Sequence, residues 1–248
     1  MTKTPACVLS LLVVFTLAAT GHAALYTGSL TYTSPSPPGA GDELYVQGTN
    51  WPGFDVTMSW EVTDADAGAP SGYPWKYSYQ FQLSGTQGAL SHLIIEASDG
   101  FSTSDISGVS GEMSSSYEIG TQNAGPGNPN MPEAVYGIKF NPSTSDDYDV
   151  SWSFYSNRVP VWGDFYAKCG TANTNTAFNA DSGQTVGFIS PDVDPSDSPS
   201  AGNSGNHYLY HILRPDSAVP EPSTLVGLVS MGLVGLGFSV LRRRQGRT

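Results

Sequence analysis

Three carboxylates lie close together in the segment 191–200, at Asp192, Asp194 and Asp197. Proline and serine residues surround them, as is typical of a surface loop. Carboxylate oxygens on such a loop are ligands that Ca²⁺ prefers. The segment lacks the glycine and the terminal glutamate of an EF-hand loop, so the calcium motif is incomplete. The sequence predicts no resident cofactor, with these three aspartates as a candidate Ca²⁺ site.

Spacings typical of catalytic residues are missing from the sequence, which has no GxSxG motif and no phosphate-binding glycine loop. His92, His207 and His211 lack the HExxH spacing of a zinc site, and we expect the last two to face outward from a strand. Glycosidases need only two carboxylates, whose spacing in a sequence is free. Four glutamates are candidates for such a pair: Glu61, Glu96, Glu118 and Glu133. Nothing selects a pair among them, so we predict that the protein is not an enzyme.

Aromatic side chains offer a different kind of site. Trp51 and Trp162 lie in or beside predicted loops. Exposed rings there could stack on sugar faces, whereas buried rings would fill the core, where large aromatic side chains contribute most. The sequence leaves both alternatives open for these two residues. For Trp60 and Trp152, which lie within predicted strands, we expect burial in the core.

Alternating side chains predict the strands that would position these residues. In the segment 75–83, large apolar residues occupy every odd position and polar residues every even one. The segments 56–62 and 148–154 repeat this pattern, which is typical of strands with one buried face. Six further strands are expected at 25–33, 90–97, 135–140, 161–167, 185–189 and 207–213. Nine strands joined by loops predict an all-β body, an antiparallel β-sandwich of the jelly-roll kind, over residues 24–215.

The body is acidic, although the chain is poor in charged residues. Only 13% of its residues are charged, against about a quarter in ordinary globular domains. Between residues 25 and 220 there are 21 acidic and five basic residues, a formal net charge of −16. Such a surface repels phosphate backbones, so we expect no nucleic-acid partner. Cys169 is the single cysteine of the body, which excludes an intramolecular disulfide there.

Residues 1–23 have the organisation of a secretory signal peptide. Lys3 supplies the positive charge, residues 8–20 form an apolar run, and Ala23 and Ala24 are small residues at the cleavage point. We expect cleavage after Ala23, with Ala24 as the next choice. Such a segment implies the Sec translocon and signal peptidase as partners, and it predicts a body outside the cytoplasm.

The C-terminal tail, residues 216–248, has three parts. The first is Val219-Pro220-Glu221-Pro222-Ser223, whose prolines favour an extended backbone. Residues 223–241 follow without a charge, and as a helix these 19 residues would span about 28 Å, close to the ~30 Å of a bilayer core. Arg242, Arg243 and Arg244 begin the basic segment 242–248, which would stop translocation and stay in the cytoplasm.

In the order and spacing of these parts, the tail resembles a PEP-CTERM sorting signal. The resemblance covers the tail alone, from Pro220 to Thr248. It implies recognition by an exosortase, a membrane cysteine transpeptidase, with cleavage at or near the Pro-Glu-Pro motif. It also implies delivery to the cell surface or the extracellular matrix of a Gram-negative bacterium that secretes polysaccharide. A permanent membrane anchor is the alternative that the residues leave open.

The function of the body remains open between two classes. The first is a non-catalytic structural or adhesive domain of an exported cell-surface or matrix protein. The second is a carbohydrate-binding module for the extracellular polysaccharide, with Trp51 and Trp162 as its candidate contacts. A glycan array with the purified body separates the alternatives: binding that is lost in Trp51→Ala or Trp162→Ala favours the second, and no binding to any glycan favours the first.

Overall fold

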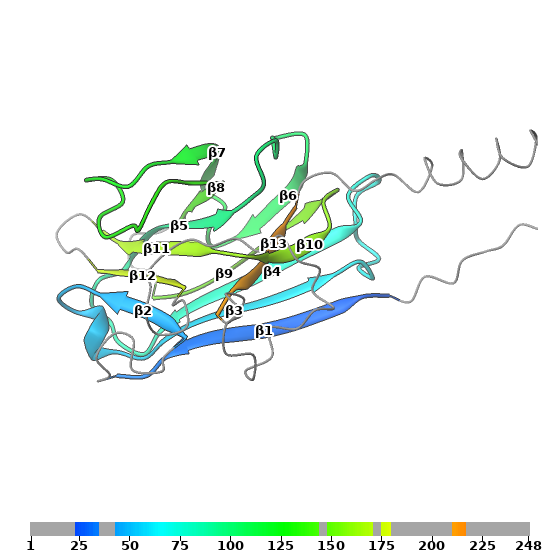
Figure 1. The fold of residues 1–248 in the computed structure, drawn as a ribbon. Helices are drawn as coiled ribbons and strands as arrows, with labels where there is room; N and C mark the ends of the chain where they lie inside the picture. Colours follow the sequence, from blue (N-terminus) through cyan, green and yellow to red (C-terminus); the bar gives the residue numbers. More distant parts are fainter. Residues whose placement is uncertain (1–22, 35–42, 144–147, 171–174, 180–209, 217–248) are drawn as a thin grey trace, which may run out of the picture.

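The computed structural model describes residues 23–34, 43–143, 148–170, 175–179 and 210–216. These residues form a five-stranded sheet, a six-stranded sheet and a two-stranded ladder, in which every pairing is antiparallel (Figure 1). Within the described part of the chain the only helix is η1 (Trp51–Gly53), a single 3₁₀ turn. The all-β prediction is therefore confirmed for the body.

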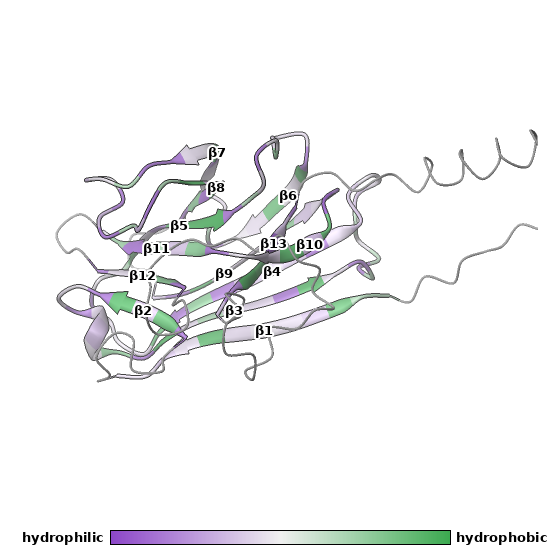
Figure 2. Cartoon of the chain, viewed as in Figure 1, coloured by the Kyte–Doolittle hydropathy of each residue, from purple (hydrophilic) through white to green (hydrophobic). Residues whose placement is uncertain are grey.

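The five-stranded sheet has the order β1-β3-β4-β9-β6. Its strands are β1 (Leu25–Tyr32), β3 (Val56–Thr63), β4 (Trp75–Leu83), β9 (Asp149–Ser156) and β6 (Ile106–Gly111). In β3, β4 and β9 alternate side chains are buried, as the period-2 pattern predicts, and apolar and polar residues follow one another along β3 (Figure 2). One face of this sheet is consequently apolar, and the other carries polar side chains, many of them serine or threonine.

The six-stranded sheet has the order β2-β12-β11-β5-β8-β7. Its strands are β2 (Leu44–Gln47), β12 (Thr176–Asn179), β11 (Phe165–Cys169), β5 (Leu90–Glu96), β8 (Val135–Asn141) and β7 (Ser116–Gln122). The remaining two strands, β10 (Pro160–Gly163) and β13 (Ile212–Pro215), pair with each other. Because β13 contacts β1 and β3 on one side and β5 on the other, this ladder lies between the two sheets.

Aromatic rings from both sheets fill the space between them. Tyr79 stacks on Trp152 at a centroid distance of 5.3 Å, and Phe140 of the six-stranded sheet lies 5.9 Å from Trp152. One continuous buried cluster joins the inner faces of the two sheets, so the body is a β-sandwich. The predicted burial of Trp60 and Trp152 is confirmed.

A smaller apolar cluster covers the outer face of the six-stranded sheet. Its buried members are Ile94, Met131, Val135, Tyr166 and Phe178. Met131 belongs to the connection between β7 and β8, which folds over β5 and β11 instead of leaving them in solvent. This explains why β5 is buried at consecutive positions, whereas the strands of the other sheet alternate.

Most of the predicted strands are confirmed. The three alternating segments are β3, β4 and β9, and the strands predicted at 25–33, 90–97 and 135–140 are β1, β5 and β8. The single strand predicted over 161–167 is wrong, because the chain changes partners at Asp164 and forms β10 and β11. The strand predicted over 207–213 is β13, which begins at Ile212, and the one predicted at 185–189 lies outside the described residues.

Four strands carry no clear sequence signal. β6 and β7 are edge strands whose side chains are mostly exposed on both faces, so no apolar alternation marks them. β2 and β12 have four residues each, which is too short for a period to be read.

Gly28 of β1 provides a test of this packing. It pairs with Trp60 of β3, and a Cβ at this position would collide with the Trp60 ring. Gly28→Ala should therefore lower the free energy of unfolding by about 1–3 kcal/mol, measured by urea denaturation. Ser29→Ala, one residue along and facing outward, is the matched control. Glycine is costly in a β-strand, so without a tight contact Gly28→Ala would be more stable than the wild type. That result would contradict the collision with Trp60.

Candidate functional site

The last described strand of the body, β13, leads into the sorting tail. This strand is buried and hydrogen-bonded to its neighbours. Ile212 and Leu213 of β13 are buried in the main core. β13 pairs along its whole length with β10, and the Tyr79 hydroxyl donates a hydrogen bond to the Leu213 carbonyl at 2.8 Å. This bond joins β13 directly to the centre of the five-stranded sheet. The chain that leads into the tail is thus an interior strand and not a loose end.

Arg214 fixes β13 from the other sheet. Its side chain is only 1% exposed, and its Nε lies 3.3 Å from a carboxylate oxygen of Glu96 at the end of β5. Nη1 donates to the Ser98 hydroxyl at 2.9 Å and to the Pro215 carbonyl at 3.2 Å. A buried guanidinium needs such partners because removing its charge from water is costly. Arg214 and its partners form what we call the C-terminal clamp.

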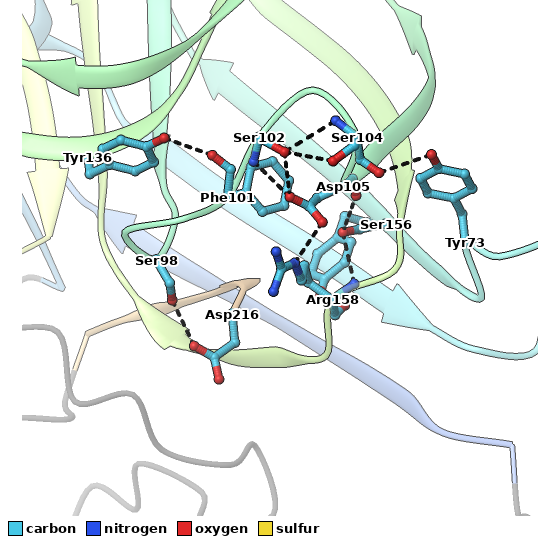
Figure 3. Close-up of polar contacts among 11 residues, drawn as sticks. Tyr73, Ser98, Phe101, Ser102, Ser104, Asp105, Tyr136, Ser156, Arg158 and Asp216 are labelled. Carbon is cyan, nitrogen blue, oxygen red and sulfur yellow. Dashed lines mark hydrogen bonds and ion pairs between the residues drawn. The ribbon is translucent and has the colours of Figure 1, made fainter. Parts of the chain in front are cut away.

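Asp216 is the first residue of the tail and the last one that the structure describes there, and the clamp extends to it. Its backbone N–H donates to the Val159 carbonyl at 2.9 Å. The Ser98 hydroxyl donates to its carboxylate at 2.7 Å, as Figure 3 shows. Ser98 therefore contacts both Arg214 and Asp216, so one short side chain joins the end of β5 to the exit point of the chain.

The connection between β5 and β6 is braced so that Ser98 stays in place. The Asp105 carboxylate accepts hydrogen bonds from the backbone N–H and the hydroxyl of Ser102. It also forms an ion pair with Arg158 (Figure 3). Burial acts to raise the pKa of the Asp105 carboxyl, but the bonds from Arg158 and Ser102 outweigh it and hold the pKa below its usual range. The Tyr136 hydroxyl anchors the same connection by donating to the Phe101 carbonyl at 2.7 Å.

Beside the clamp lies a buried histidine–carboxylate pair. His211 Nδ1 is 2.8 Å from an oxygen of Asp164, and the exposed fractions of the two side chains are 4% and 0%. The outward orientation predicted for His211 is therefore wrong. The pair has the geometry of two members of a hydrolytic triad, but a substrate cannot reach side chains enclosed in this way. We interpret it as part of the packing that holds β13.

A second buried histidine holds the cover over the six-stranded sheet. His92 Nε2 donates to the Asn128 side-chain oxygen at 2.9 Å, since the amide nitrogen of Asn128 is itself a donor to the Asn123 carbonyl. Burial, helped by the nearby charge of Lys139, lowers the pKa of His92 to about 4. The ring is neutral at pH 7 and holds the connection between β7 and β8 through this hydrogen bond to Asn128.

The two tryptophans predicted as candidate sugar platforms are in the interior. Trp51 is 0% exposed, its ring lies 5.5 Å from that of Phe81, and its Nε1 donates to the Gly88 carbonyl at 2.6 Å. Trp162 is 8% exposed and packs edge-to-face on Trp60 at 6.1 Å. The prediction that these two rings stack on sugars is therefore wrong, because both are buried in the core and do not reach solvent.

The other predicted site residues lie mostly outside the described residues. These are Asp192, Asp194 and Asp197, the motif from Val219 to Ser223, the apolar span 223–241 and Arg242, Arg243 and Arg244. Across the described ranges, no three His, Cys, Asp or Glu side chains come together as a metal ion would require. In the same ranges no helix has both the length and the apolar character needed to cross a membrane.

The geometry defines a class of protein: an all-β domain whose final strand is locked into the fold immediately before a C-terminal tail. Residues 218–244 of that tail match the PEP-CTERM protein-sorting motif, two residues after Asp216. The resemblance inferred from the sequence is confirmed by this match. No curated protein and no solved structure matches the chain.

The clamp predicts a specific effect of Arg214→Met, which keeps the length of the side chain and removes its charge. The Glu96 carboxylate then loses the guanidinium beside it, so unfolding should become easier by about 3–5 kcal/mol in urea denaturation. Exchange of the backbone amide hydrogens should rise first at residues 212–214. Lys168→Met, which removes a charge from the half-buried position of the otherwise buried strand β11, is the control. Replacing Glu96 with Leu as well should restore part of the loss, and equal exchange in wild type and variant would refute the clamp.

His92 predicts a pH dependence of stability. Its pKa is about 4 in the folded chain, against ~6.5 unfolded, so the unfolded state binds the proton more readily. Its contribution is complete above pH 6.5 and is lost progressively as the pH falls to 4, by about 3 kcal/mol in all. His92→Gln keeps a donor for Asn128 and should flatten the curve of unfolding free energy in that window. Parallel curves for the two proteins would show that His92 does not titrate in this way.

Proposed function

We propose that the protein is exported, sorted at the membrane by an exosortase and delivered to the cell surface or extracellular matrix, where its body serves as a non-catalytic structural or adhesive domain. The match of residues 218–244 to the PEP-CTERM protein-sorting motif is the observation that carries this proposal. Exosortase is the processing partner that the motif implies. The acidic charge of the body suits a domain that must stay soluble outside the cell.

The tail has a physical arrangement that suits such processing. Pro220 and Pro222 disfavour helix, so Glu221 would be held in an extended backbone, the form in which proteases bind their substrates. The uncharged segment 223–241 is long enough to cross the bilayer, and Arg242–Arg244 would keep the end of the chain in the cytoplasm. The body would then lie on the far side of the membrane. A tail that stays uncut would act as a permanent anchor with the same orientation.

The start of the body supports signal-peptide removal at the proposed position. The Ala24 backbone nitrogen lies 2.6 Å from a carboxylate oxygen of Asp64. Cleavage after Ala23 by signal peptidase would turn this nitrogen into an ammonium group that already faces a carboxylate. The Thr63 hydroxyl holds the Ala24 carbonyl at 2.7 Å, so Ala24 belongs to the folded domain. A cut after Ala23 would thus leave the fold complete.

A non-catalytic role is supported by the enclosure of the reactive side chains. The Asp164–His211 pair is buried beside the clamp, and the thiol of Cys169 is buried in the main core. Neither is placed to meet a substrate. The large interior of stacked aromatic rings is what a stable scaffold requires.

Changing Pro220, Glu221 and Pro222 to alanine tests the sorting. The variant should accumulate in the inner membrane at the mass of the chain without its signal peptide, whereas the wild type should be trimmed and leave the membrane. Fractionation, immunoblotting and intact-mass measurement give the result. A triple alanine change at Pro195, Ser196 and Asp197 is the control and should be sorted normally. If the motif variant is released at the trimmed mass of the wild type, the motif is not the sorting element.

A further inference from the structure

A polar groove crosses the outer face of the five-stranded sheet and has a volume of about 530 Å³. The side chains that line it are mainly serine hydroxyls, together with the amide of Gln80. These positions are the outward half of the alternation in β3, β4 and β9, and in most sheets they would carry larger residues. Serine at the centre of a sheet leaves the backbone uncovered, which is why the face is hollowed here.

The registers of the strands arrange these side chains in two rows. One row runs across the sheet through Ser59, Gln80 and Ser151. The other lies two residues away and consists of Thr27, Glu61, Ser78, Ser153 and Ser110. Since neighbouring strands lie ~4.8 Å apart, this second row presents one polar group per strand along a path of about 19 Å over five strands, and the first row covers the three central ones.

The floor between the rows belongs to three strands that are each hydrogen-bonded on both sides. It is made by the backbone of Trp60, Tyr79 and Trp152, which pair in register and turn their rings into the core. Gly111 closes the end of the groove at β6, where a Cβ would collide with the backbone at Ser151. The short side chains above this floor lose little conformational entropy on binding, so the groove is organised before a ligand arrives.

The groups in the groove select a class of ligand. Hydroxyls and amides both donate and accept hydrogen bonds, as the hydroxyls of a sugar do. The groove contains one carboxylate and one ammonium group, Glu61 and Lys76, and Lys76 is paired with Asp66 at 2.6 Å. With little net charge in the groove and an acidic body around it, an anionic polymer gains nothing and is repelled at longer range.

We propose that this groove binds a neutral polysaccharide chain lying across the strands. The spacing of the polar groups, one per strand, is comparable to the length of one pyranose ring, so successive sugars can meet successive strands. Without an exposed tryptophan in the groove, each sugar is held by hydrogen bonds alone, and binding depends on engaging several units at once. The proposal goes beyond sorting and does not depend on whether the tail is cut.

Affinity electrophoresis of the full chain in a non-ionic detergent tests this proposal. The gels contain dextran, amylose or hydroxyethyl cellulose as neutral probes and alginate as an anionic one. At least one neutral polymer should retard the protein, and alginate should not. Retardation by alginate alone, or by none of the four, would overturn the proposal.

A matched pair of variants on β3 locates the binding. Ser59→Arg fills the groove, whereas Thr57→Arg adds the same side chain to the same face two residues away, outside the groove. The first should weaken binding about tenfold or more and the second should leave it within about twofold. Gln80→Ala, which only removes an amide, should weaken it by a smaller factor. Equal binding by the two arginine variants would overturn the proposal, as would a groove-dependent dimer in sedimentation that competes with the polymer.

Discussion

The burial of Arg214 between the two sheets is the constraint on which the architecture of the body depends. β13 is only four residues long, yet it contacts strands of both sheets and joins them through hydrogen bonds from Tyr79 and to Ser98. A cation at 1% exposure is tolerated because it forms an ion pair with Glu96 and donates hydrogen bonds to Ser98 and the Pro215 carbonyl. Without that pair, the strand would have to bring an uncompensated charge into an aromatic core. The position of β13 is therefore determined by charge as much as by apolar burial.

The two faces of the five-stranded sheet have separate roles. The inner face supplies Tyr79 and Trp152 to the core, where the two rings stack on each other. The outer face, between the same residues, carries serine and glutamine, which leave that backbone accessible. Large side chains inward and small ones outward produce a stiff sheet with a shallow polar surface. The same alternation thus stabilises the fold and shapes the groove.

The sequence predicted the strands that have one buried face, because a period of two appears only there. β3 and β4 could be located to within a residue, whereas β6 and β7 could not, since exposed edge strands carry no apolar pattern. The change of partner at Asp164 depends on contacts with Glu96 and His211, which are distant in the sequence. No local pattern encodes contacts of that kind.

The candidate sites divide in the same way. The sorting motif was recognisable because its parts are contiguous, and the match at residues 218–244 confirms it. The burial of Trp51 and Trp162 depends on partners such as Gly88 and Trp60 from other strands. The groove depends on the register of three strands, so the serines on β4 and β9 had no visible relation before the pairing was known. Repeated serine at outward positions was the one available signal.

The location of β13 at the end of the body would also set an order of events during the proposed export. A chain that crosses the membrane with its N-terminus first delivers this strand after all the others, immediately before the apolar span. The interior between the sheets cannot close until that moment, because Leu213 and Arg214 complete it. On the proposed route, folding of the domain and arrival of the tail at the membrane would be tied together, and a nascent chain stalled before its last 37 residues, which begin with β13, would emerge with an open sandwich.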